Sequence, residues 1–472
     1  MIYLKTLTSD YNSNLHTINE ILRVGEVFDI TVKHMKLGGK KATFYCLNGF
    51  VKDEMFEKEL EYLSEITKED MDKIEDADEF LDTYITYIQC KTENDIDKLI
   101  TQILSGAVAL IVEGFTKAVI IDCRTFPARG VQEPESDKVL RGSHEGFVET
   151  VIFNTALIRR KIRNPNLTMK AYQIGSESKT DVVICYLEDV VDRKQLEILT
   201  KKLQRINPKH LSMSQESLKE SLMPHQPWNP FPKVRYTERP DAASACIYDG
   251  NIIVLTDGSP SAMIIPTGIF DFVQDINDYY FPPLIGTFLR FVRMAVFTLS
   301  MLLIPIWYLL VIYEDKLPDA LEFMMIEEDY TVPLIVQLLI VEFVIDTLRL
   351  ASLNTPSALS SSFSVVGALV LGEFAVRSGW FVSEVVLFMA FVAISNFTQP
   401  SYELGYAIKI SRVFILILCG LFKIWGLVIG LALVLLLIAT TKTLGGYTYL
   451  YPLMPFNAEA LKGLIIRQPK KE

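Results

Sequence analysis

The sequence predicts an α/β cytosolic region of two small subdomains, followed by an all-α polytopic membrane domain. Three observations lead to this prediction. Of the 472 residues, 50% are hydrophobic, and the long apolar runs lie almost entirely in residues 281–472. Residues 1–280 instead alternate between short strand-like and helix-like patterns. The later part is nearly neutral, so the net charge of −11 belongs to the first part.

Residues 1–126 are predicted to form the first subdomain. Alternation with a period of two on both sides of Gly38-Gly39 predicts a β-hairpin over residues 28–51. Thr92 or Asn94 is expected to cap the last helix of this subdomain. Apolar spacing predicts helices over 14–22, 53–66, 69–84 and 93–104, and strands that begin at 88 and cover 107–112 and 117–122.

Residues 127–283 are predicted to form the second subdomain and the membrane-proximal linker. A connection rich in Pro, Gly and charge, residues 124–142, leads into it. Its predicted helices cover 145–162, 193–205 and 240–247, its strands 168–174, 181–187, 252–256 and 262–266, and a loop covers 208–235. Near the end of the linker, Tyr279, Tyr280 and Phe281 suit an aromatic anchor at a membrane surface.

A basic run ends the first helix of the second subdomain. It consists of Arg159, Arg160, Lys161 and Arg163. Basic residues in the last helical turn are stabilised by the helix dipole, so a solvated helix end explains them. A contact surface for an acidic partner in the cytosol explains them as well.

Residues 284–450 are predicted to form the helical transmembrane domain, with about four to six membrane segments. The first covers 291–313, contains Pro305 and begins beside Arg290 and Arg293. The following connection, 314–330, holds seven acidic residues against one lysine. The positive-inside rule therefore keeps the arginines cytoplasmic and puts this connection across the membrane. The second segment covers 333–350 and returns to the cytoplasmic side.

Two further apolar lengths complete this domain. Residues 363–396 are too long for one crossing and short for two, so a tight hairpin and a re-entrant piece both fit. Lys409 and Arg412 are expected to mark a cytoplasmic return. Residues 413–440 are expected to form two short helices that turn near 421–426, with a single tilted span as the alternative. The basic tail, 451–472, is expected in the cytoplasm.

Polar residues at membrane depth are the candidates for function. They are Gln337, Glu342, Asp346, Glu373 and Glu384. Glu342, Asp346 and Arg349 are spaced by four and three residues, which puts them on one helical face. A charge at bilayer depth costs about 3 kcal/mol, so it normally faces protein or water. These residues therefore either pair internally, for example Asp346 with Arg349, or line a hydrated ion path.

The sequence contains no recognisable catalytic motif, so an enzyme is not expected. The six cysteines form no CxxC pair, and the five histidines are dispersed. We therefore expect free buried thiols, no metal site and no cofactor, in a reducing compartment. The acidic first part also argues against nucleic-acid binding.

Several long motifs identify a family. The run VLRGSHEGFVETVIFNTALIRRKIRNPNLTMKAYQIGSESKTDVVICYLEDV, TERPD at 237–241, DGSP at 257–260 and FNAEALKGLIIRQP at 456–469 strongly resemble the bacterial spore germination A-subunit family. Nutrient-receptor A subunits usually carry Pro at the position of Glu384, and Gln is common at that of Glu373. The chain is therefore more similar to a sporulation member of the family than to a nutrient-receptor subunit, as its residues 346–376 and 395–412 also indicate.

The resemblance implies a function. Subunits of this family are thought to form rings, such as pentamers, that act as ion channels in the spore inner membrane, with the soluble N-terminal region in the cytoplasm. For this chain the resemblance implies release of monovalent cations from the spore core, amplification of germinant-receptor signalling, and a small accessory membrane protein as partner. The alternatives are an A subunit of a nutrient germinant receptor, a secondary transporter, and a non-conducting scaffold that clusters receptors.

Overall fold

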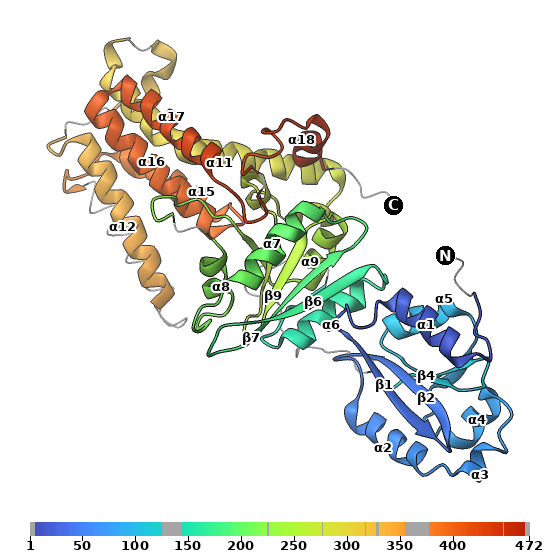
Figure 1. Ribbon diagram of the computed structural model, residues 1–472. Helices are drawn as coiled ribbons and strands as arrows, with labels where there is room; N and C mark the ends of the chain where they lie inside the picture. Colours follow the sequence, from blue (N-terminus) through green and yellow to red (C-terminus); the bar gives the residue numbers. More distant parts are fainter. Residues whose placement is uncertain are drawn as a thin grey trace. The chain divides into compact units, whose positions relative to one another are not determined.

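The computed structural model describes residues 5–124, 143–223, 226–275, 277–316, 318–326, 330–354, 377–446 and 448–467 (Figure 1). The chain divides into two compact units. The first contains Met1–His225, Val234–Pro266 and Leu444–Gly446, and the second contains Gln226–Lys233, Thr267–Thr443 and Tyr447–Glu472. The division into four segments at 126, 283 and 450 remains a prediction.

The first unit contains two five-stranded antiparallel sheets with the same plan. One has the order β1-β2-β4-β5-β3 and the other β6-β7-β9-β10-β8. In each, a long hairpin comes first and the next strand along the chain lies at the far edge. The strands are β1 Ile30–Leu37, β2 Lys40–Leu47, β3 Cys90–Glu93, β4 Val108–Val112, β5 Ala118–Ile121, β6 Leu167–Ile174, β7 Thr180–Leu187, β8 Arg235–Thr237, β9 Ile252–Thr256 and β10 Ala262–Ile265.

Helices cover both faces of each sheet, because alternate strand residues enter different apolar cores. Around the first sheet they are α1 Tyr11–Leu22, α2 Asp53–Ser64, α3 Lys68–Met71, α4 Ala77–Tyr84 and α5 Ile96–Leu104. Around the second they are α6 Val151–Lys161, α7 Arg193–Arg205, α8 Gln215–Leu222 and α9 Pro240–Tyr248. The α/β prediction for this region is confirmed.

Four details of the prediction were wrong. The helix over 69–84 is two helices, because Asp76 accepts hydrogen bonds from the backbone N–H groups of Asp78 and Glu79 and starts α4. The cap of α5 is Asp95, not Thr92 or Asn94. Helix α6 begins at Val151 rather than 145, and α8 lies within the region predicted to be a loop.

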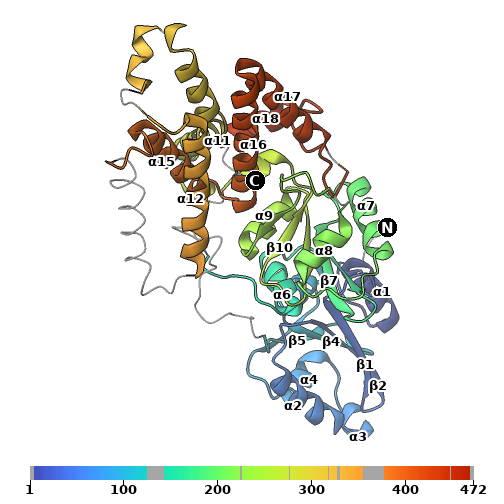
Figure 2. The ribbon, with the colours of Figure 1, turned by 90° about the vertical axis from the view of Figure 1, so that its left-hand side faces the viewer.

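The second unit is helical and is built around an apolar core. Its helices are α10 Asn277–Tyr280, α11 Pro283–Ile312, α12 Leu334–Asn354, α15 Ser383–Phe397, α16 Tyr402–Phe422, α17 Ile424–Thr440 and α18 Ala458–Ile465, with short 3-10 turns at Ile269–Phe272, Glu314–Lys316 and Asp319–Met324. Helix α16 packs against α11 and α17 (Figures 1 and 2). Pro305 lies inside α11 without ending it. The indole N–H of the buried Trp307 donates to the carbonyl of Met324 over 2.8 Å.

Among the described residues, two helices of this unit, α11 and α16, are long and apolar enough to cross a membrane, and α15 and α17 are shorter apolar helices. The predicted turn near 421–426 is confirmed: α16 ends at Phe422, and Lys423 has a φ of 52°. Gly426 permits the tight hairpin, because a Cβ there would lie 2.0 Å from the carbonyl oxygen of Leu418. Residues 363–376, the first part of the apolar length 363–396, lie outside the described residues, so the choice between a tight hairpin and a re-entrant piece remains a prediction.

Candidate functional site

The candidate site is a seam of opposite charges between α12 and α16 in the helical unit. Glu342 on α12 pairs with Arg412 on α16, and Asp346 pairs with Lys409. Residue numbers rise along α12 as they fall along α16, so the two helices are antiparallel. We call these four residues the charged seam.

The Glu342–Arg412 pair is buried among apolar helices. Glu342 is 7% exposed and Arg412 is 1% exposed. One carboxylate oxygen of Glu342 accepts from Nη2 of Arg412 and, over 3.2 Å, from its Nε. Nη1 of Arg412 donates over 2.7 Å to the carbonyl of Ser300 on α11. The guanidinium of Arg412 therefore joins three helices, because Nε and Nη2 donate to the carboxylate on α12 and Nη1 donates to the carbonyl on α11.

The Asp346–Lys409 pair extends the seam by one turn. The ammonium of Lys409 also donates to the backbone carbonyl of Glu342 over 3.3 Å. Asp346 is only partly buried. Because both carboxylates find a cation on α16, the seam is neutral as a whole, which lowers the cost of keeping four charges in an apolar unit.

Arg349 is the remaining cation on this face of α12, and it has an aromatic environment. Its guanidinium carbon lies 5.5 Å from the ring centroid of Phe397, 5.3 Å from that of Tyr402 and 4.9 Å from that of Tyr406. Cations within about 6 Å of an aromatic centroid are attracted by the ring quadrupole. The predicted pairing of Asp346 with Arg349 was wrong, because Lys409 takes the carboxylate and the three rings surround the guanidinium.

Gln337 has a different role from the seam. Gln337 lies on α12 before Glu342 and is fully buried. Its Nε2 donates to the carbonyl of Val332 over 2.8 Å. Its Oε1 accepts from the backbone N–H of Val382 over 3.0 Å. Gln337 thus ties the start of α12 to the start of α15, whose first N–H groups need acceptors.

Glu384 and Glu373 complete the set of candidates. Glu384 lies in the first turn of α15, where a negative charge is favoured by the helix dipole. Its Oε2 atom is buried and has no hydrogen-bond partner among the described residues. It does not join the charged seam. Glu373 lies outside the described residues.

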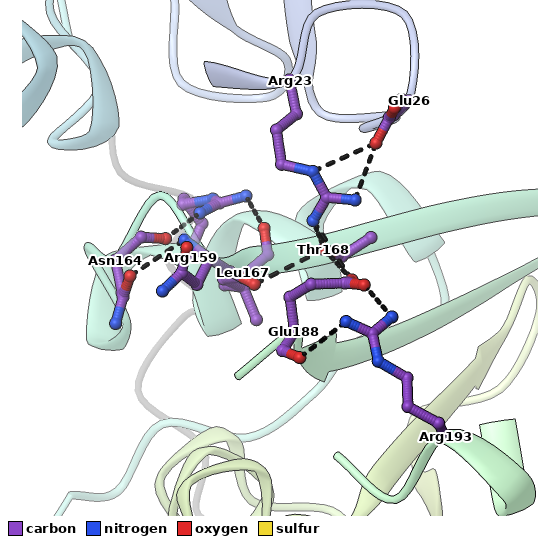
Figure 3. Close-up of polar contacts among 9 residues, drawn as sticks. Arg23, Glu26, Arg159, Asn164, Leu167, Thr168, Glu188 and Arg193 are labelled. Carbon is purple, nitrogen blue, oxygen red and sulfur yellow. Dashed lines mark hydrogen bonds and ion pairs between the residues drawn. The ribbon is translucent and has the colours of Figure 1, made fainter. Parts of the chain in front are cut away.

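The basic run of the first unit is mostly engaged within the chain. Arg159 is 1% exposed and donates from Nε and Nη2 to the carboxylate of Asp29 over 2.6 and 3.1 Å. Its guanidinium also donates to the carbonyls of Asn164 and Leu167, each over 3.0 Å (Figure 3). These bonds join the two sheets, because Asp29 directly precedes β1 and α6 packs on the second sheet.

The rest of the run is more accessible. Arg160 and Lys161 both pair with Glu145, over 2.7 and 3.3 Å. Arg163 is exposed. Of the four basic residues predicted as a contact surface, Arg159 therefore has no exposed guanidinium to offer, and the other three remain candidates.

A second ionic group lies at the same junction (Figure 3). Nη1 of Arg23, in the turn after α1, donates to Glu188 over 3.1 Å and to the hydroxyl of Thr168 over 2.6 Å. Arg193 pairs with the same carboxylate. Burial alone would raise the pKa of Glu188, but the hydrogen bonds from Arg193 and Arg23 outweigh it and hold that pKa below its ordinary value.

Sequence reasoning assigned Lys409 and Arg412 to a membrane boundary and therefore missed their role. The missing information was the start of α16 at Tyr402, which places both cations inside the helix rather than before it. Their spacing of three residues matches the spacing of four on α12 closely enough for pairing across an antiparallel contact. That match was visible in the sequence.

The comparisons with known proteins identify the family. Residues 16–472 match the family described as "Bacillus/Clostridium GerA spore germination protein". The chain belongs to this family. The stage V sporulation protein AF of Bacillus subtilis (strain 168) is 39% identical over 95% of this chain and 90% of its own length. Spore germination protein KA of the same organism is 27% identical over 94% of this chain and 82% of its own length.

A solved structure also matches part of this GerA-family chain. It is the crystal structure of the N-terminal domain of the A subunit of the Bacillus megaterium spore germinant receptor GerK3. The identity is 24%, the TM-score is 0.42, and the match covers 55% of this chain and 95% of that chain.

Proposed function

We propose that this GerA-family protein is a subunit of an oligomeric ion channel in the spore inner membrane. It releases monovalent cations from the spore core and amplifies the signal of germinant receptors. Its helical unit crosses the membrane several times, its first unit lies in the cytoplasm, and it assembles as a ring, such as a pentamer, together with a small accessory membrane protein. The similarity to the stage V sporulation protein AF supports the location in the spore and the role in germination, and the charged seam supports the mechanism.

The observation that carries the mechanism is the pairing of two α12 carboxylates with two α16 cations. Apolar helices that merely pack together do not need buried charges, and replacing a buried ion pair by apolar residues is often stabilising. Charges retained at such a cost are commonly part of an ion or proton pathway. In the closed arrangement, Lys409 and Arg412 neutralise Glu342 and Asp346.

Separation of α12 from α16 would expose both carboxylates on one helical face. Repeated around a ring, that face would form rings of acidic side chains, which select cations. The same motion would expose Lys409 and Arg412, so the α16 cations must move away from the path for cations to pass. Opening is therefore a movement of α12 relative to α16. Glu384, whose Oε2 atom is buried and has no hydrogen-bond partner within the described parts of the chain, is the second candidate for the path.

One observation favours a non-conducting scaffold instead: every charge of the seam already has a partner within one chain. In that case the seam would only hold helices together. Charge neutralisation alone cannot separate the two functions, because Glu342→Gln also breaks the pair. A charge swap can separate them, because it restores the pair and moves the carboxylate to the other helix.

The experiment follows potassium release from germinating spores. We expect Glu342→Gln with Asp346→Asn to slow release, and the swap Glu342→Arg with Arg412→Glu to restore normal protein level without restoring normal release. The protein level is measured in spore membranes for every variant. Normal release by the swapped protein, or by the neutralised protein at normal level, would show that the carboxylates of α12 do not line the path.

A further inference from the structure

Trp228 is exposed on a loop that is itself held firmly. The residue is 92% exposed, and Gln226 and Pro227 beside it are exposed too. Three residues later Phe231 is buried in the core of the helical unit. The carbonyl of Pro232 accepts from the hydroxyl of Tyr449 over 2.6 Å. The loop is therefore anchored at its second half and presents an indole outward, although large aromatic side chains usually bury most of their surface.

The position of this loop along α17 is fixed by a hydrogen bond. Nδ2 of Asn229 donates over 2.7 Å to the hydroxyl of Thr441, the first residue after α17. The exposed apolar face of α17 runs from Ile424 to Leu436. Trp228 directly precedes Asn229 in the chain, so it lies beside the end of α17.

A second tryptophan lies at the other end of the same helix. Trp425, the second residue of α17, is 68% exposed. At ~1.5 Å per residue, 425 and 441 are about 24 Å apart along the axis, somewhat less than the ~30 Å hydrocarbon core. Tryptophans are enriched at both membrane–water interfaces, where the ring is partly apolar and its N–H reaches polar groups. The pair fits the two interfaces of one bilayer.

The C-terminal segment adds a second exposed apolar group. Its exposed members are Leu453, Met454, Phe456, Ile465 and Ile466. The segment is fixed to the first turns of α11: Nη1 of Arg290 donates to the carbonyls of Gly463 and Leu464 over 2.9 and 3.2 Å. The backbone N–H of Arg467 donates to the hydroxyl of Thr287 over 3.1 Å. On α11 itself, Leu284 and Phe288 are exposed nearby in sequence.

Both groups belong to the same end of the helical unit. Tyr449, which holds the loop of Trp228, also accepts through its carbonyl from the backbone N–H of Ile269 over 2.9 Å. Ile269 lies in the segment that leads into α11, and Tyr449 lies in the segment that leaves α17. The segment that leads into α11 and the segment that leaves α17 are therefore neighbours.

We propose that Trp228 and the exposed residues of 453–466 form an interfacial collar that lies in the lipid headgroup region. The inference rests on the proposed membrane placement of the helical unit, and it does not depend on conduction. A lipid surface is the occupant that fits, because the collar is bonded to the first turns of α11 and to the end of α17, and both helices carry exposed apolar side chains. Lys462 and Glu459 are both exposed in this segment, so its exposed charges balance and the apolar side chains carry the argument for a lipid surface.

The test measures tryptophan fluorescence of the full-length protein in vesicles that contain phosphatidylglycerol. The emission that Trp228→Phe removes is the emission of Trp228. We expect lipids brominated near the headgroup to quench it more than lipids brominated near the chain ends, and aqueous iodide to quench it weakly. A second variant adds Phe456→Trp to Trp228→Phe, and its new emission is expected to respond in the same way.

The control places a tryptophan at an exposed position of the first unit, Tyr62→Trp on α2, where iodide should quench and brominated lipids should not. If iodide quenches Trp228 as strongly as this control, and brominated lipids leave it unchanged, the collar does not contact lipid. A protein without conductance could still pass this test. A negative result here would therefore contradict the collar and would leave the channel proposal to be decided by its own experiment.

Discussion

Glu342 of α12 and Arg412 of α16 form a buried ion pair, and the same guanidinium reaches the backbone of α11 at Ser300. Seventy residues separate the partners along the chain. The pair fixes which faces of three helices meet, and it holds a carboxylate in an apolar unit without leaving it unpaired. Any movement of α12 away from α16 must first break this pair.

Removing one partner of the pair should destabilise the helical unit strongly. Arg412→Gln leaves Glu342 buried without its cation, and loss of one partner of a buried pair typically costs about 3–5 kcal/mol. We expect a marked loss of protein from spore membranes and a lower melting temperature in detergent. Replacing both, Glu342→Gln with Arg412→Met, should recover most of the stability. Equal losses in the single and double variants would show that the pair itself is unimportant.

The aromatic environment of Arg349 should contribute through the ring faces rather than through the tyrosine hydroxyls. Tyr406→Phe keeps the ring that lies 4.9 Å from the guanidinium, and Tyr406→Leu removes it. A cation–π contact at an exposed site is worth about 0.5–1 kcal/mol, so the Leu variant should melt slightly earlier than the Phe variant. The same melting temperature for both would indicate that only the volume of the side chain matters.

The Asp29–Arg159 pair should hold the two sheets of the first unit together. In Asp29→Asn the guanidinium of Arg159 keeps its two backbone acceptors but loses its carboxylate. We expect faster proteolysis of the full-length protein between the sheets, and faster hydrogen exchange at the start of β1 and around 164–168. Arg163→Gln, an exposed member of the same basic run, serves as the control and should change neither.

The junction should also weaken in acid. The pKa of Glu188 is lowered in the folded protein, so its ionised form stabilises the junction above the ordinary pKa of ~4.3. That contribution disappears as the pH falls from there through the folded pKa, because the carboxyl must be protonated. Hydrogen exchange of β6 and β7 should therefore accelerate in this acid range. Glu188→Gln should lose this part of the pH dependence, and an unchanged profile would contradict the assignment.

Much of the first unit could be predicted from its residues, because period-two alternation and turn glycines are local signals. The hairpin at Gly38-Gly39 and helix 193–205 are examples. Helix α6 begins late because Asp257, from a distant turn, accepts the N–H of Val151 over 3.0 Å. No local pattern reports an acceptor 106 residues away. The common strand order of the two sheets is likewise a property of long-range pairing.

Only the α12 side of the candidate site could be predicted from the sequence. The shared face of Glu342, Asp346 and Arg349 follows from helical spacing, and it was visible in the sequence. The partners on α16 were not assigned, because a cation at the end of an apolar run is normally a boundary marker. Only the packing of α12 against α16 distinguishes a boundary cation from a buried counter-ion. Glu373 lies outside the described residues, so its place in an ion path remains a prediction.

We propose that the carboxylates of the charged seam line the path by which cations cross the membrane. The most direct measurement is the reversal potential of the purified protein in planar bilayers with unequal KCl on the two sides. The wild-type protein should conduct with cation selectivity, and the double swap of Glu342 with Arg412 and Asp346 with Lys409 should lose that selectivity while remaining folded. Equal selectivity in both proteins, or no conductance by the folded wild-type protein with its partners present, would contradict the account.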